Sequence, residues 1–165
     1  MSVGTILFSI YFLLGGFKEI KIIESRNNIY SIAGKKFTGR MKSDTLRNYF
    51  DEIKGHILDN NVQGELCIVN FRSENLKDDH VSQFIGIVLD NEISEIPSGL
   101  SVMELQSDIT LKTALTMHPL VRPNPDKIEG LMHAFAQKNG YELQELSLEI
   151  LYSDNSVMVE MFAKM

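Results

Sequence analysis

The C-terminal stretch LSLEILYSDNSVMVEMF, residues 146–162, has the pattern of two strands joined by a short DN turn. Successive side chains of a strand point to opposite faces. Leu146, Leu148 and Ile150 therefore share one face, which is uniformly apolar. We expect this face to pack beneath helices. Glu149 would then point to the open side of an antiparallel sheet.

Length, charge and cysteine content limit the classes of function. The chain has 165 residues, 44% of them hydrophobic and 23% charged, which is typical of one globular domain. The net charge is −6, and no basic run is longer than Lys35-Lys36, so we expect no nucleic acid partner. Cys67 is the only cysteine, which excludes an intramolecular disulfide and a Cys-based metal site. We expect Cys67 to be a core residue.

The N-terminal segment 1–17 contains no charged side chain. It is slightly shorter than the roughly 20 residues that usually span a bilayer. We predict a hydrophobic membrane anchor over 1–17, followed by one domain over 18–165. A cleaved signal peptide and a buried element of a soluble domain are the alternatives. Lys18, Lys21 and Arg26 all follow the segment, so the positive-inside rule predicts a single-pass protein with its domain on the cytosolic side.

The remainder of the chain shows one order of patterns twice: strand, strand, helix, strand, strand. The expected strands are 19–23, 28–41, 65–71 and 81–90, then 100–106, 109–118, 146–153 and 156–163. Asn27-Asn28 would form the turn between the first two strands. This order predicts two pseudo-repeats, over about residues 19–90 and 100–164.

Each half also contains one amphipathic helix pattern. The first helix is expected to begin at Ser43 and Asp44 and to end near Asn60-Asn61, with an apolar stripe of Leu46, Phe50, Ile53 and Ile57. The second is expected to begin at Asn124 and Pro125 and to end at Asn139-Gly140, with a stripe of Ile128, Leu131 and Phe135.

These elements predict an α+β fold. Duplicated strand-helix-strand-strand units would form an antiparallel sheet with pseudo-two-fold symmetry, two helices on one face and a concave groove on the other. Glu149 would lie on the floor of this groove, where low solvation strengthens the attraction of a cation and raises the pKa of a carboxyl. Four aromatic residues of the strands would either line the groove or fill the core: Tyr30, Phe71, Phe84 and Tyr152.

Motifs of common catalytic and cofactor sites are missing from the sequence. It has no G-x-S-x-G, no G-x-G-x-x-G and no Walker loop. His80 follows Asp78 and Asp79, but no second histidine stands at ligand spacing, so we expect no metal site and no cofactor. These features favour a protein that is not an enzyme.

Three stretches together resemble the GyrI-like small-molecule-binding domain over about residues 19–164. They are GKKFTG, FIGIVLDNEISEIPSGLSVMEL and LSLEILYSDNSVMVEMF. The local patterns are Gly39 before the first helix, Pro97, Gly99 and Leu100 after the strand that contains Ile85 and Gly86, and Leu148, Glu149 and Ile150. The family includes a DNA gyrase inhibitor and the effector-binding domains of bacterial multidrug-response regulators.

The resemblance implies a small-molecule ligand in a groove where Glu149 contacts cationic or polar groups. With the expected anchor, the chain is similar to a membrane-anchored branch that includes the domain of a testis-expressed reticulophagy receptor. We therefore expect a membrane-anchored domain that binds a small, cationic or amphipathic ligand between the two pseudo-repeats. One alternative is a protein-interaction module that receives a peptide by strand addition. The other is a hydrolase of the family's catalytic branch, which the lack of tryptophan disfavours.

Overall fold

The computed structural model describes residues 9–16, 18–59, 61–72, 76–90 and 96–164. Its elements are β1 (Ile23–Arg40), α2 (Asp44–Leu58), β2 (Gly64–Phe71), β3 (His80–Leu89), β4 (Ser101–Leu115), the 3-10 helix η1 (Pro119–Val121), α3 (Pro125–Asn139), β5 (Glu142–Leu151) and β6 (Val157–Lys164). The fold class is α+β, as expected. The pseudo-repeat and the domain boundary after residue 17 stay predictions.

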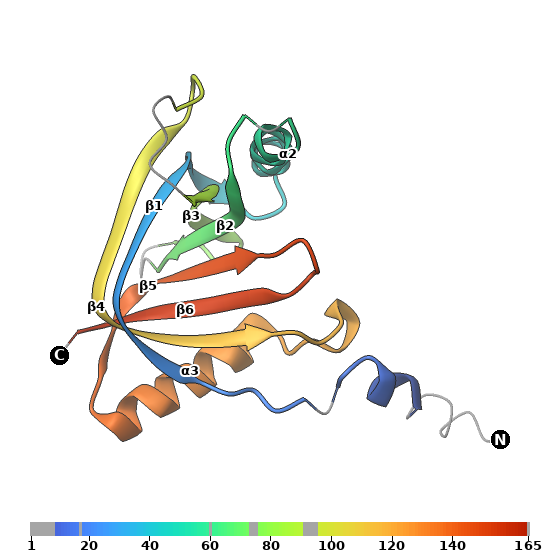
Figure 1. Ribbon diagram of the computed structural model, residues 1–165, viewed down its shortest axis with the longest axis vertical. Helices are drawn as coiled ribbons and strands as arrows, with labels where there is room; N and C mark the ends of the chain where they lie inside the picture. The colour runs from blue at the N-terminus through green and yellow to red at the C-terminus, as the bar shows by residue number, and fades with distance from the viewer. Residues whose placement is uncertain (1–8, 17, 60, 73–75, 91–95, 165) are drawn as a thin grey trace.

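The sheet is a barrel rather than the open sheet that we expected. In the described part of the chain, six antiparallel strands close in the order β1-β3-β2-β5-β6-β4 (Figure 1). β1 closes the ring because it is long enough to pair with two strands: residues 23–34 pair with β4 and residues 32–40 pair with β3. The expected concave face is therefore curled into a barrel interior.

β1 and β4 each replace two expected strands. The sequence predicted breaks at Asn27-Asn28 and between 106 and 109, but both strands run through these positions. Asn27 has a φ of 54°, a left-handed conformation that asparagine tolerates better than most residues. Asn28 pairs with Ser107, so the two predicted breaks lie opposite each other. The sequence signals thus mark a kink in a paired ribbon, and not a turn.

The kink changes which face the side chains take. Met103 and Leu105 of β4 pack in the barrel interior. Leu111 and Leu115, at positions of the same parity, pack against α3 instead. Because side chains alternate with a period of two, the alternation of β4 shifts by one residue between Leu105 and Leu111. One strand therefore supplies apolar side chains to two different cores.

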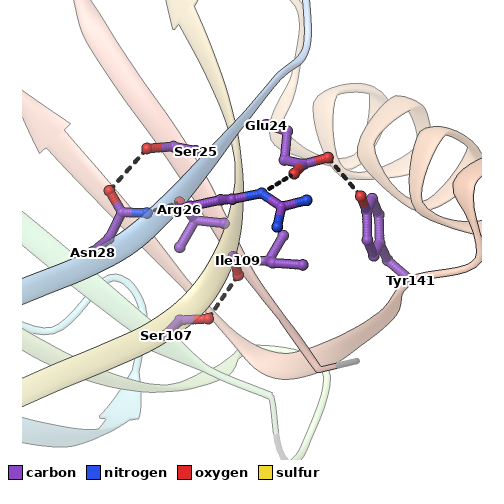
Figure 2. Close-up of polar contacts among 8 residues, drawn as sticks. Glu24, Ser25, Arg26, Asn28, Ser107, Ile109 and Tyr141 are labelled. Atoms are coloured by element: carbon purple, nitrogen blue, oxygen red, sulfur yellow. Dashed lines mark hydrogen bonds and ion pairs between the residues drawn. The ribbon is translucent and has the colours of Figure 1, made fainter.

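Side-chain hydrogen bonds hold the ribbon at the kink (Figure 2). Ser25 Oγ donates to Asn28 Oδ1 at 3.0 Å, and Asn28 Nδ2 donates to Thr110 Oγ1 at 2.7 Å. On β4, Ser107 Oγ donates to the carbonyl oxygen of Ile109 at 2.6 Å. These bonds satisfy polar groups where the regular alternation is interrupted.

A second contact in the same view ties β1 to the start of β5. Glu24 accepts from Arg26 Nε at 2.8 Å and from the Tyr141 hydroxyl at 2.5 Å (Figure 2). Tyr141 follows Gly140, which ends α3 in a left-handed conformation with a φ of 75°. The end of the helix is thereby fixed beside the strand that closes the barrel.

Both helices begin at the predicted caps. The Ser43 side chain accepts from the backbone N–H of Leu46, and the Asn124 side chain accepts from that of Lys127. The stripe of the first helix packs as predicted, on a core that includes Ile85 and Ile87 of β3. The predicted stripe of the second helix is wrong at Leu131, which is exposed; the buried residues of α3 are Ile128, Met132 and Ala136.

A third core cluster fills the barrel interior. Its buried and partly buried members come from all six described strands and from neither α2 nor α3. Cys67 belongs to it and is fully buried, as expected, and burial raises the pKa of its thiol to about 12. The helices accordingly pack on the outer side of the barrel, with α2 beside β2 and β3 and α3 beside β4, β5 and β6.

The N-terminal segment touches the end of β4. A short helix covers residues 9–13, the carbonyl oxygen of Leu14 accepts from the His118 N–H, and Lys18 Nζ donates to Thr116 Oγ1. No helix within the described ranges combines the length and apolar character that crossing a membrane requires. Residues 1–8 and 17 of the predicted anchor lie outside those ranges, so membrane attachment and the cytosolic location of the domain stay predictions.

Substitution of Asn27 tests the kink. Asn27→Val should lower the free energy of unfolding by about 1–2 kcal/mol, because a β-branched residue is strained in the left-handed region. Asn27→Gly should change it by less than about 0.5 kcal/mol, since glycine adopts this conformation freely. Urea denaturation measures both. Equal stability of the valine and glycine variants would contradict a conformational role for this residue.

Candidate functional site

The structure reverses the expected faces of β5. Leu148 and Ile150 are buried in the barrel interior, and Leu146 packs against them. Glu149 lies on the opposite, outer side, where Val159 of β6 is its cross-strand partner and packs against α3. The prediction that the three apolar residues pack beneath helices is therefore wrong. Because the sheet closes into a barrel, its inner face is buried. The apolar side of β5 therefore points into the barrel interior.

The four predicted aromatic residues do come together, but without Glu149. Tyr30, Phe71, Phe84 and Tyr152 all pack on the interior cluster. Phe84 is buried, and the other three are partly exposed. Tyr30 comes from β1, Phe71 from β2 and Phe84 from β3, so the closed ring brings distant segments onto one surface.

A different carboxylate lies among these aromatic residues. Glu160 of β6 is only 1% exposed, and its neighbours on the same face, Met158 and Phe162, pack in the interior cluster. Its Oε1 accepts from the Tyr30 hydroxyl at 2.7 Å and lies 3.0 Å from Lys112 Nζ. Its Oε2 is buried and has no hydrogen-bond partner among the described residues. An unsatisfied carboxylate oxygen at such a depth is costly, and it can accept a hydrogen bond from a ligand.

Tyr30 and Lys112 complete this interior site. Lys112 Nζ also donates to the Tyr30 hydroxyl oxygen at 2.8 Å. Burial, followed by the hydrogen bond to Glu160, raises the pKa of Tyr30 well above its usual value. The phenol therefore stays protonated at neutral pH and donates its proton to the carboxylate.

The interior cluster is not sealed from solvent. Its partly buried apolar members are Tyr30, Phe71, Val88, Met103, Leu105, Leu146, Tyr152 and Met158. An apolar surface with a few convergent polar groups is the usual composition of a small-molecule site. The interior surface around Glu160 has this composition.

Sequence reasoning missed Glu160, although a signal was present. In VMVEMFA, both alternating faces are apolar, so the one charged residue is out of place on either face. The same argument selected Glu149 in LSLEILYS instead. What distinguishes Glu160 is the direct pairing of Lys112 with it across β4 and β6, a contact between distant segments that periodicity does not reveal.

Glu149 lies in a second site, an outer groove of about 850 Å³ between β2, β3, β5 and α3. A polar chain crosses its floor. Gln83 Nε2 donates to Asn70 Oδ1 at 2.7 Å, and Asn70 Nδ2 donates to Glu149 Oε1 at 2.9 Å. This direction leaves Gln83 Oε1 buried with no partner among the described residues. The groove thus presents acceptors, as a ligand rich in donors requires.

Burial raises the pKa of Glu149, and the hydrogen bond from Asn70 opposes this effect. The carboxylate of Glu129 on α3 raises it further. Glu129 itself forms an ion pair with Arg72, which lies at the end of β2 on the same groove. The outer groove therefore carries charges of both signs around a carboxyl that resists ionisation.

Comparisons with known proteins identify the fold. No family model and no curated protein matches the chain. A hydrolase from Listeria innocua aligns with a TM-score of 0.62 and 9% identity, over 94% of this chain and 98% of its own. The EcmrR C-terminal domain aligns with a TM-score of 0.56 and 12% identity, over 88% and 97%. SAV2435 bound to tetraphenylphosphonium aligns with a TM-score of 0.50 and 13% identity, over 89% and 94%.

At such identities the likeness shows the fold alone. The neighbours are consistent with the GyrI-like effector-binding fold that the sequence resembled. They differ in what they do, since one is a hydrolase and another is bound to a small molecule. The absence of a nucleic acid partner and of enzymatic activity stay predictions for this chain.

The raised pKa of Glu149 predicts a pH dependence of stability. Because the folded state raises the pKa of Glu149, protonation of this carboxyl stabilises the folded state. The stabilisation is fully present below the unfolded pKa of about 4.3 and is lost as pH rises through the higher folded pKa. Glu149→Gln retains an oxygen that accepts from Asn70 but cannot ionise. Urea denaturation between about pH 4 and pH 7 should show the variant gaining stability relative to the natural chain as pH rises. A difference that does not change with pH would contradict the burial of this carboxyl.

Proposed function

We propose that the chain is a ligand-binding domain that takes a small, largely apolar molecule into the barrel interior against Glu160. One observation carries the proposal: Glu160 Oε2 is a buried acceptor that has no partner within the described part of the chain, and it belongs to a face whose aromatic side chains are partly exposed. This location replaces the groove around Glu149 that we expected from the sequence.

The energetic argument has two parts. A ligand that donates a hydrogen bond to Oε2 removes the cost of a buried, unsatisfied acceptor, which is about 1–3 kcal/mol or more for a charged group. A ring placed against Tyr30, Phe71 and Tyr152 removes their exposed apolar surface from water. The polar contact fixes the orientation of the ligand, and the apolar contact contributes most of the affinity.

The comparisons support binding in general. A protein of the same fold has been observed with tetraphenylphosphonium, a bulky aromatic cation. Another neighbour is the C-terminal domain of EcmrR. Because the identities are low, the ligand and its position in this chain are our proposals and rest on the contacts of Glu160.

Two rival functions have their own observations. In strand addition, a peptide would pair with residues 101–106 of β4, which among the described strands pair only with β1. In hydrolysis, the Tyr30–Glu160 pair would act as a general acid and base. A fold neighbour is a hydrolase. We favour binding without turnover because Lys112 and Tyr30 already engage Glu160 Oε1, which restrains its exchange of protons.

A thermal-shift screen of small aromatic amides, alcohols and amines against the full chain tests the proposal, since a ligand that binds only the folded state raises the melting temperature. For each hit, Glu160→Gln should weaken binding at least about tenfold, because a charged acceptor is replaced by a neutral one. Glu149→Gln is the matched control and should change the affinity by less than about twofold.

The two variants also show whether the ligand binds in the barrel interior or in the outer groove. If Glu149→Gln abolishes binding and Glu160→Gln does not, the ligand occupies the outer groove and the interior assignment is wrong. Unfolding of each variant in urea serves as the check on its fold. A peptide that binds with no small-molecule hit would favour strand addition to β4, and product formation from a hit would favour the hydrolase.

A further inference from the structure

The barrel interior already contains a positively charged group. Lys112 Nζ lies 3.0 Å from Glu160 Oε1, and the lysine side chain is only 15% exposed. The ammonium group also lies 5.4 Å from the centroid of the Tyr30 ring. A carboxylate together with an aromatic face is the environment that a cationic ligand would use.

The strand pairing fixes this lysine in place. Lys112 is the direct cross-strand partner of Glu160, and the two side chains point to the same face of the sheet. The shift in alternation between Leu105 and Leu111 is what directs Lys112 inward, because without it residues of even number would face α3. The contact follows from the backbone and does not depend on a flexible loop.

A second lysine adds positive charge to the same surface. Lys36 Nζ lies 5.6 Å from the ring centroid of Phe71, which packs on the interior cluster. Lys112 is the ammonium group in direct contact with Glu160. A second carboxylate acts on the same cluster, because the charges of Glu160 and Glu65 both raise the pKa of Tyr152 after burial does. A positively charged ligand at Glu160 would meet repulsion from Lys112.

We propose that Lys112 is an internal counter-ion that occupies the position of a cationic ligand, so that the interior site selects uncharged hydrogen-bond donors over cations. This inference rests on the proposed function, because it assumes that ligands bind at Glu160. The acceptor left to a ligand is Oε2, which requires a donor such as an amide N–H or a hydroxyl. The ligand class is therefore a neutral aromatic amide or alcohol, whereas the sequence led us to expect a cationic or amphipathic ligand.

Benzamide and benzamidinium form a matched pair of probes for this selectivity. They have the same shape, both donate N–H hydrogen bonds, and only benzamidinium carries a positive charge. Calorimetry on the full natural chain should show binding of benzamide that is at least about tenfold tighter than that of benzamidinium.

Variants of Lys112 then test its role. Lys112→Gln removes the charge but keeps an amide that donates to Glu160 and Tyr30, and it should reverse the preference in favour of benzamidinium. Lys112→Arg keeps the charge and should preserve the preference for benzamide. Adding Glu160→Gln to Lys112→Gln should abolish the gain in benzamidinium affinity, because the carboxylate that attracts the cation is removed.

The outcomes separate the inference from the proposed function. If benzamide binding depends on Glu160 but Lys112→Gln leaves the preference unchanged, the site is correct and the counter-ion role of Lys112 is wrong. If the natural chain prefers benzamidinium, the inference is also wrong. If neither probe binds the natural chain or any folded variant, the proposed interior site fails, and the inference fails with it.

Discussion

The contact of Lys112 and Tyr30 with the Glu160 carboxylate constrains how the barrel is built. A carboxylate with 1% exposure needs a charged or donating partner, and the two partners come from β4 and β1. Tyr30 lies in the part of β1 that pairs with β4, and β4 also pairs with β6, so the Tyr30 hydroxyl reaches Glu160 across β4. The pairing of β4 with both β1 and β6 therefore brings the two partners of Glu160 together.

The kink at Asn27 links this arrangement to the helices. If the alternation of β4 were unbroken, Leu105 and Lys112 could not both face the interior while Leu111 packs beneath α3. Because of the shift, β4 contributes to both sides of the sheet: Lys112 points into the interior, and the adjacent Leu111 belongs to the core beneath α3. The outer groove with Glu149 lies on the outer side of the barrel, between β2, β3, β5 and α3.

Local features were predictable from the sequence, and long-range ones were not. The caps at Ser43 and Asn124 and the end of α3 at Gly140 depend on a few neighbouring residues, so their patterns are sufficient. Alternation correctly separated Leu148 and Ile150 from Glu149, but it assigned the two faces the wrong way round, because which face is inside depends on closure by β1. The importance of Glu160 depends on its pairing with Lys112, which no local pattern contains.

Methionine methyl groups report directly on where a ligand binds. Met103 and Met158 pack on the interior cluster, Met41 lines the outer groove, and Met132 of α3 is buried in the core between α3 and the outer side of the sheet. In a chain labelled with ¹³C at its methionine methyl groups, titration with benzamide should shift the signals of Met103 and Met158 saturably and leave that of Met41 unchanged. Shifts at Met41 without shifts at Met103 and Met158 would place the ligand beside Glu149 and contradict an interior site at Glu160.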